Sequence, residues 1–265
     1  NPQYKIKPRF VELSDKKDSA DDISRINLIK SLDYSDFKEG RLSNEKIAVN
    51  YRLLQPKNAD KKKKHPLILV FHGSGAIGTN NTSQMGVLSK MWLLPEYREK
   101  FSVFVLSPQF PVRSSNYHLD KIRNVQVSES NEYLDLVLKS VDSLSKTSNI
   151  DESRIYVIGF SMGGSTVMNA ISKRPDLFAA AINVSGISDF SNMENLKNLP
   201  IRIIHGGLDT DNRPESNVKF YNEMKDVGNI FFFKYKDRYH NNILSSEAVA
   251  SIAEWLSLEK LKKRK

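Results

Sequence analysis

The chain has 265 residues, 39% of them hydrophobic, and this size suits one large α/β domain or two small ones. It contains no cysteine, which excludes disulfides, zinc–thiolate sites and a thiol nucleophile, and no run approaches the roughly 18 apolar residues of a membrane span. The net charge of +9 is concentrated in Lys61–Lys64 and residues 260–265, which leaves 31 of the 40 basic residues against 31 acidic ones and argues against a nucleic-acid-binding face.

From residue 46 onward, short apolar runs alternate with segments of helical periodicity. The predicted strands are 46–54, 67–71, 103–106, 155–158, 179–184, 201–204 and 230–235. The predicted helices are 83–100 with a break at Pro95, 131–146, a helix that follows the fourth strand and runs to Lys173, 214–227 and 246–258. Buried strands that alternate with helices predict an α/β fold with a mostly parallel sheet covered on both faces.

Residues 1–45 lack strong periodicity and are rich in Asp, Lys and Ser. We expect them to form a lead-in segment that packs on one catalytic domain, residues 46–265, whose basic C-terminal end is a solvated tail. The loops at the carboxyl edge of a parallel sheet are where catalytic side chains gather.

The most informative motif is Gly159-x-Ser161-x-Gly163, which directly follows the apolar run Ile155–Ile158. A strand, a sharp turn with a serine at its tip and a helix together form a nucleophile elbow. The two glycines remove Cβ atoms that would clash in so tight a turn, and Gly164 lets the following helix pass close to the sheet. Ser161 is therefore the predicted nucleophile.

A serine hydroxyl needs a base, and the base needs an acid that orients it. Behind a nucleophile elbow the acid and then the histidine follow the serine along the chain. Two histidines, His205 and His240, follow Ser161. His240 lies in a polar loop after the last predicted strand and is the predicted base, whereas His205 is expected to hydrogen-bond within its own loop. Asp209 is the preferred acid, and Asp211 in the same loop remains an alternative.

The tetrahedral intermediate also requires backbone N–H donors. One is the N–H of Met162, which follows the nucleophile. The second is expected from Ser74, in the glycine-rich loop after the strand Leu67–Phe71, and His72 is expected to support that loop. No cluster of metal-ligating residues is present in the sequence, and no cofactor is predicted.

These motifs, together with the runs LILVFHGSGAIGTNN, Ser107-Pro108-Gln109 and HGGLD, resemble the α/β-hydrolase superfamily from about residue 46 to the end of the chain. Within it, the chain is similar to the feruloyl-esterase-like and "predicted peptidase" groups near carbohydrate esterase family one. The resemblance implies a carboxylic ester hydrolase that acts on acylated polysaccharides. It also implies an exported protein, periplasmic, surface-bound or secreted, whose signal is not part of this chain; a cytoplasmic location stays open.

The short interval between the strands that end near Val184 and begin near Ile201 leaves no room for a large lid, so we expect an open site. Candidate walls are Met91–Trp92 and the stretch 110–117, and the predicted substrate-contacting residues are Trp92, Gln109 and Tyr117. For Trp92, packing in the core is an equal alternative.

The leading hypothesis is a serine carboxylesterase that hydrolyses feruloyl- or acetyl-type esters, small or carried on a polysaccharide, through an acyl-enzyme. The alternatives are a peptidase of the prolyl-oligopeptidase type, which would use the same residues, and a non-catalytic binding module on a hydrolase scaffold. The acyl group, the alcohol and the oligomeric state stay open.

Overall fold

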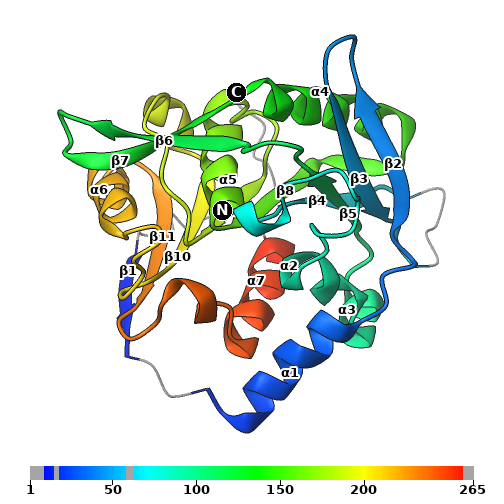
Figure 1. Cartoon of the computed structure of the whole chain (residues 1–265), viewed down its shortest axis with the longest axis horizontal. Helices are drawn as coiled ribbons and strands as arrows, with labels where there is room; N and C mark the ends of the chain where they lie inside the picture. The colour runs from blue at the N-terminus through cyan, green and yellow to red at the C-terminus, as the bar shows by residue number, and fades with distance from the viewer. Residues whose placement is uncertain (1–8, 15–17, 58–62, 259–265) are drawn as a thin grey trace, which may run out of the picture.

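A twisted sheet runs through the centre of the molecule (Figure 1). The computed structural model describes residues 9–14, 18–57 and 63–258, and in these residues the sheet has nine strands in the order β1-β11-β10-β9-β8-β4-β5-β3-β2. The seven strands from β1 to β5 in this order are parallel, and β3 and β2 extend the sheet antiparallel. Lys61, Lys62 and the C-terminal basic segment, residues 260–265, lie outside the described residues.

The sheet strands are β1 (Arg9–Leu13), β2 (Lys38–Ser43), β3 (Ala48–Leu54), β4 (His65–Phe71), β5 (Phe104–Gln109), β8 (Ile150–Phe160), β9 (Ala180–Val184), β10 (Pro200–Gly206) and β11 (Asn229–Tyr235). The helices are α1 (Ala20–Ser31), α2 (Val87–Lys90), α3 (Pro95–Lys100), α4 (Glu132–Thr147), α5 (Met162–Lys173), α6 (Glu215–Met224) and α7 (Ser246–Leu258). Every predicted strand overlaps an observed one, and the segment predicted as a helix around Pro95 is divided into α2, a 3-10 turn and α3.

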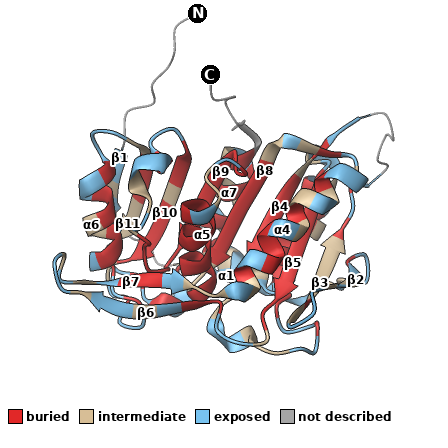
Figure 2. Ribbon diagram, turned by 90° about the horizontal axis from the view of Figure 1, so that it is seen from above, coloured by how far each residue is buried: buried red, intermediate tan, exposed pale blue. Residues whose placement is uncertain are grey.

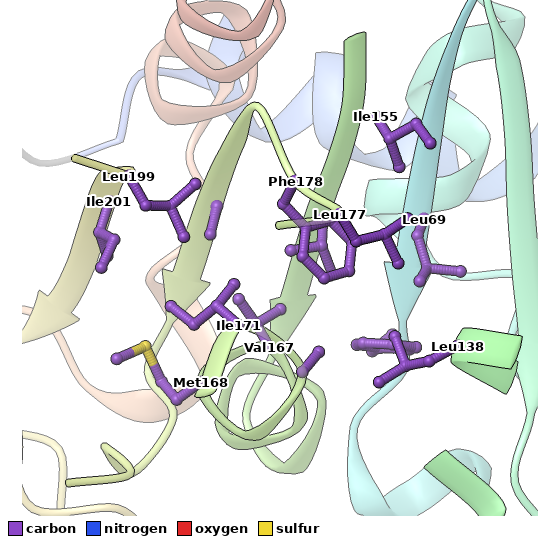
Figure 3. Packing of buried hydrophobic residues seen from close by; sticks show 14 of the residues in the cluster. Leu69, Leu138, Ile155, Val167, Met168, Ile171, Leu177, Phe178, Leu199 and Ile201 are labelled. Atoms are coloured by element: carbon purple, nitrogen blue, oxygen red, sulfur yellow. The ribbon is translucent and has the colours of Figure 1, made fainter. Parts of the chain in front are cut away.

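Helices cover both faces of the sheet, as Figure 2 shows from above, and each face has its own apolar core. Side chains of α4, α5 and α6 pack on one face, in a cluster that includes Val167, Met168 and Ile171 of α5 and Leu69, Ile155 and Ile201 of the strands (Figure 3). Side chains of α1, α2, α3 and α7 pack on the other face. The strands contribute to both cores because successive residues of a strand point to opposite faces of the sheet. The predicted α/β-hydrolase architecture is confirmed.

The N-terminal segment contributes to the same sheet. β1 pairs with β11 at one edge and β2 pairs with β3 at the other, while α1 lies against α2 and α7. α1 begins with a capping box in which the Ser19 hydroxyl accepts a hydrogen bond from the N–H of Asp22 and the Asp22 carboxylate accepts one from the N–H of Ser19.

A β-hairpin that the sequence did not suggest is inserted between β5 and α4. Its strands β6 (Ser115–Asp120) and β7 (Val125–Ser130) project beside α6 (Figure 1) and pack on α5. Hydroxyl groups fix the hairpin to α5: Ser115 Oγ donates to Asn169 Oδ1 at 2.8 Å, and Tyr117 Oη is 2.9 Å from Ser165 Oγ.

The loops that follow β4, β5, β8, β10 and β11 meet at the carboxyl edge of the parallel strands, so the sheet itself brings the candidate catalytic residues together. Between β9 and β10 the chain forms only loops and a 3-10 turn, Met193–Leu196. Among the described residues, no helix is long and apolar enough to cross a membrane.

Candidate active site

Ser161 occupies the tip of the turn between β8 and α5, with φ 58° and ψ −122°. A non-glycine residue at positive φ is strained, and the packing around the turn holds it there. A Cβ at Gly159 would lie 2.2 Å from the Gly163 oxygen, and one at Gly163 would lie 2.2 Å from the Phe71 oxygen. Only glycine fits at either position, and the tight turn presents the serine above the sheet.

His240 follows β11 and faces this serine. Its Nε2 lies 2.8 Å from Ser161 Oγ, and its Nδ1 lies 2.7 Å from Asp209 Oδ2. An ionised carboxylate can only accept hydrogen bonds, so Nδ1 carries the proton and Nε2 is free to accept from the serine hydroxyl. The ring of Phe160 lies against the imidazole, with 5.0 Å between ring centroids, and this contact helps to fix the plane of the ring.

Asp209 is buried at the end of β10 with both oxygens occupied. Its Oδ1 accepts the N–H groups of Asp211, at 3.0 Å, and Asn212, at 2.9 Å. Burial acts to raise the pKa of Asp209, but hydrogen bonds from His205, His240 and the Asn212 amide outweigh it and hold the pKa well below the ordinary range. The structure therefore brings Asp209 to the imidazole, whereas Asp211 lines the cleft outside this triad.

His205 is fully buried beneath the acid. Its Nε2 lies 2.7 Å from the Asn212 carbonyl and 3.2 Å from Asp209 Oδ2, and both acceptors require the proton to be on Nε2. Asn217 Nδ2 donates to His205 Nδ1 at 2.7 Å. The sequence predicted that His205 bonds within its loop but not that it contacts the acid.

The candidate oxyanion donors, the N–H groups of Met162 and Ser74, are each on the first residue of a helical turn, where no intrahelical acceptor exists. The Ser74 loop passes close to the nucleophile, since a Cβ at Gly73 would lie 3.5 Å from Ser161 Cβ. His72 supports the loop: its Nδ1–H donates to the Gly73 carbonyl at 2.8 Å, and its Nε2 accepts the Phe110 N–H at 2.9 Å. Burial lowers the pKa of His72, consistent with a neutral ring.

Two of the predicted substrate contacts need correction. Gln109 is 1% exposed, and its side chain ties the loop after β4 together by donating to the Ala76 carbonyl and accepting the Asn81 N–H. Trp92 is 2% exposed and packs against Tyr97 and Phe101 in the core between α2 and α3. Gln109 ends β5 beneath the loop after β4, and Trp92 lies in the 3-10 turn Met91–Leu93 within the core, so neither reaches the catalytic cleft.

Tyr117, the third predicted contact, does line the cleft. The cleft has a volume of about 700 Å³ and includes Ser161 and His240, with a largely polar wall of Arg113, Asn116, Asp211, Asn212 and Asn241. The Arg113 guanidinium stacks over the Tyr117 ring at 5.0 Å. Arg113 and Asn116 lie within the stretch 110–117 that the sequence predicted as a candidate wall, although neither was singled out there. The described residues contain no group of three or more His, Asp or Glu side chains that could hold a metal ion.

Comparisons with known proteins agree with this architecture. Residues 126–231 match the prolyl oligopeptidase family. A bifunctional acetylxylan esterase/xylanase, XynS20E, from Neocallimastix patriciarum is 31% identical over 104 residues, 39% of this chain and 14% of that protein.

Solved structures give the same picture. A thermostable esterase is 29% identical with a TM-score of 0.74, over 85% of this chain and 63% of its own. The acylaminoacyl peptidase of Pyrococcus horikoshii has the same fold, with a TM-score of 0.60 and 17% identity over 86% of this chain and 42% of its own. This chain therefore spans less than two thirds of each of these relatives.

Proposed function

We propose that this chain, which has the fold of the α/β-hydrolase superfamily, is a serine carboxylesterase in which Ser161, His240 and Asp209 form the catalytic triad. The observation that carries the proposal is the position of one imidazole, 2.8 Å from a strained serine hydroxyl and 2.7 Å from a buried carboxylate.

In the proposed reaction, His240 Nε2 takes the proton of Ser161 as Oγ attacks the ester carbonyl carbon. The N–H groups of Met162 and Ser74 stabilise the oxyanion that forms. The tetrahedral intermediate collapses, the bond to the alcohol oxygen breaks, and His240 returns the proton to the departing alcohol. Water then attacks the acyl-enzyme by the same proton route and releases the acid.

A carbohydrate is the proposed alcohol. The cleft beside Ser161 is lined by guanidinium, amide, carboxylate and phenol groups, which suit the hydroxyl groups of a sugar. The similarity to an acetylxylan esterase supports the same choice. The proposed acyl group of such a substrate is acetyl or feruloyl. Because its substrate would be a plant polysaccharide, we also propose that the protein is exported.

A serine peptidase of the prolyl-oligopeptidase type is the second candidate. Its support is the family match over residues 126–231, and such a peptidase would use the same nucleophile, base and acid as the esterase. A non-catalytic binding module is disfavoured, since it would not require a strained serine bonded to an oriented imidazole.

The deciding experiment is a panel of p-nitrophenyl acyl esters, methyl hydroxycinnamates and an acetylated xylan oligosaccharide, with a peptide p-nitroanilide alongside. We expect ester hydrolysis at least about 100-fold faster than amide hydrolysis, and its loss in Ser161→Ala. Preferential cleavage of the anilide would favour the peptidase, and equal rates in wild type and Ser161→Ala would refute the proposed nucleophile.

A further inference from the structure

A second hollow adjoins the catalytic cleft. This apolar groove has a volume of about 310 Å³ and runs between α1, α2 and the segment after His240. Gly73, Phe160 and Asn241 line both the groove and the cleft, so the groove begins beside the nucleophile. Ser161 itself lines only the cleft, so the two spaces meet beside the serine, at Gly73 and Phe160.

The linings of the two spaces differ in chemistry. The groove is lined mostly by apolar side chains, among them Val70, Leu88 and Ile243, whereas charged and amide groups dominate the cleft. An ester has two parts that extend from the reacting carbon. A polar alcohol suits the cleft, and an apolar acyl group suits the groove, because apolar surface gains most from leaving water.

One polar atom on the groove lacks a partner. Gln84 lines the groove and is 3% exposed, and among the described residues its Oε1 has no hydrogen bond. Its orientation follows from its neighbours: the Tyr51 carbonyl accepts from Asn81 Nδ2, so Asn81 Oδ1 faces Gln84 and accepts from its Nε2 at 2.7 Å. A buried acceptor without a donor is costly, and a ligand that supplies the donor would satisfy it.

We propose that the groove binds the acyl group of the substrate, and that this group is apolar, longer than acetyl and carries a hydrogen-bond donor for Gln84. The inference rests on the proposed esterase function. It adds that the acyl group lies in the groove and the alcohol lies in the cleft. It favours substrates with a sizeable hydroxylated acyl group over simple acetyl esters.

Gly86 offers a way to block the groove. It lies on the groove, and a Cβ at this position would meet nothing within 4 Å, so a side chain can begin here without a clash at its Cβ. Gly86→Trp is the blocking variant, and Gly86→Ala is its matched control. We compare p-nitrophenyl acetate with p-nitrophenyl hexanoate, because each methylene that leaves water is worth about a fourfold gain in affinity.

In the wild type we expect kcat/KM for the hexanoate to exceed that for the acetate by at least about tenfold. Gly86→Trp should remove this preference and leave the acetate within about twofold, while Gly86→Ala should keep it. Equal rates for the two esters in the wild type, or equal losses in Gly86→Trp, would overturn the groove as the acyl site.

The donor is tested with 6-hydroxyhexanoyl and 8-hydroxyoctanoyl p-nitrophenyl esters against the unhydroxylated esters. Gln84→Met keeps the length of the side chain and removes the acceptor, so the ratio of hydroxylated to plain kcat/KM should fall at least about tenfold for one of the pairs. An unchanged ratio for both pairs would overturn the role of Gln84.

The failure of the esterase proposal can be separated from that of the groove. Methyl and hexyl fluorophosphonates label a catalytic serine without ester turnover, and faster labelling of Ser161 by the hexyl reagent, abolished in Gly86→Trp, supports the groove. If that preference holds while no ester is hydrolysed, the esterase proposal alone is refuted. If neither reagent labels Ser161, both the esterase proposal and the groove proposal are refuted.

Discussion

His205 Nε2 lies 3.2 Å from Oδ2 of Asp209, four residues further along the chain, so two imidazoles hold the same carboxylate oxygen. The imidazole of His205 faces the protein interior and also donates to the Asn212 carbonyl oxygen. The backbone N–H of Asn212 in turn donates to Oδ1 of Asp209. The acid is thereby fixed from below by a closed set of hydrogen bonds, and His240 is oriented by a carboxylate that cannot turn.

Replacing His205 by leucine should lower kcat by between about 10- and 100-fold with little change in KM, because the acid loses its fixed position. The free energy of unfolding should fall by about 1–3 kcal/mol, since Asn212 O and Asn217 Nδ2 lose buried partners. Steady-state kinetics and urea denaturation measure the two effects. His118→Leu, at an exposed histidine of the hairpin, is the control. An unchanged kcat in His205→Leu would show that the contact between His205 and Asp209 does not contribute to catalysis.

Asp209→Asn should reduce kcat by about four orders of magnitude, because an amide can donate to Nδ1 and so stabilise the wrong tautomer of His240. Asp211→Asn should change kcat less than about threefold, since the Asp211 carboxylate lies on the cleft wall and only its backbone N–H contacts the acid. Each variant replaces one carboxylate oxygen of the wild type by an amide nitrogen, and the two positions lie in the same loop. If Asp211→Asn were the crippling change, the assignment of the acid would be wrong.

How far the sequence leads depends on how local each signal is. The elbow could be predicted because its glycine spacing is a local feature of the sequence. Asp209 and His240 could be predicted because each directly follows a strand that is visible in the sequence, in the chain order that the elbow leads one to expect. β6 and β7 were missed because their apolar residues are sparse. Leu119 of β6 and Ile122 of the connecting turn are exposed, and hydroxyl groups of the hairpin bond to α5.

The placement of Gln109 and Trp92 was beyond the sequence for a different reason. Gln109 ends β5 at the carboxyl edge of the sheet, whereas Trp92 lies toward the amino ends of β4 and β5, beside His65 and Val103. A sequence does not say whether such a side chain turns into the cleft or the core. Gln109 turns inward to three partners of the loop after β4, and Trp92 fills space between helices.

The stability of the protein should depend on Asp209 in acid. A carboxyl whose pKa is lower in the folded state contributes stability that is fully present above its unfolded pKa, about 3.9, and is lost as the pH falls through the lower folded value. The free energy of unfolding of the wild type should therefore decrease below about pH 4, and that of Asp209→Asn should decrease less steeply. Guanidinium titrations between pH 2.5 and 7 measure the slopes, with Asp211→Asn as the control. Parallel slopes for all three proteins would contradict the lowered pKa.

The pH dependence of catalysis provides a test that does not require the natural substrate. The base must be neutral to accept the Ser161 proton, so kcat/KM should fall in acid with the slope of one proton, in the range between about pH 5 and 8 where histidines titrate. The lowered pKa of Asp209 keeps that carboxylate ionised throughout this range, so it adds no second proton to the limb. A stopped assay with p-nitrophenyl butyrate from pH 4 to 9 gives the profile, and a parallel series with EDTA should be unchanged because the proposed chemistry uses no metal. An acid limb near pH 4, a two-proton slope or inhibition by the chelator would each contradict a histidine base acting on Ser161.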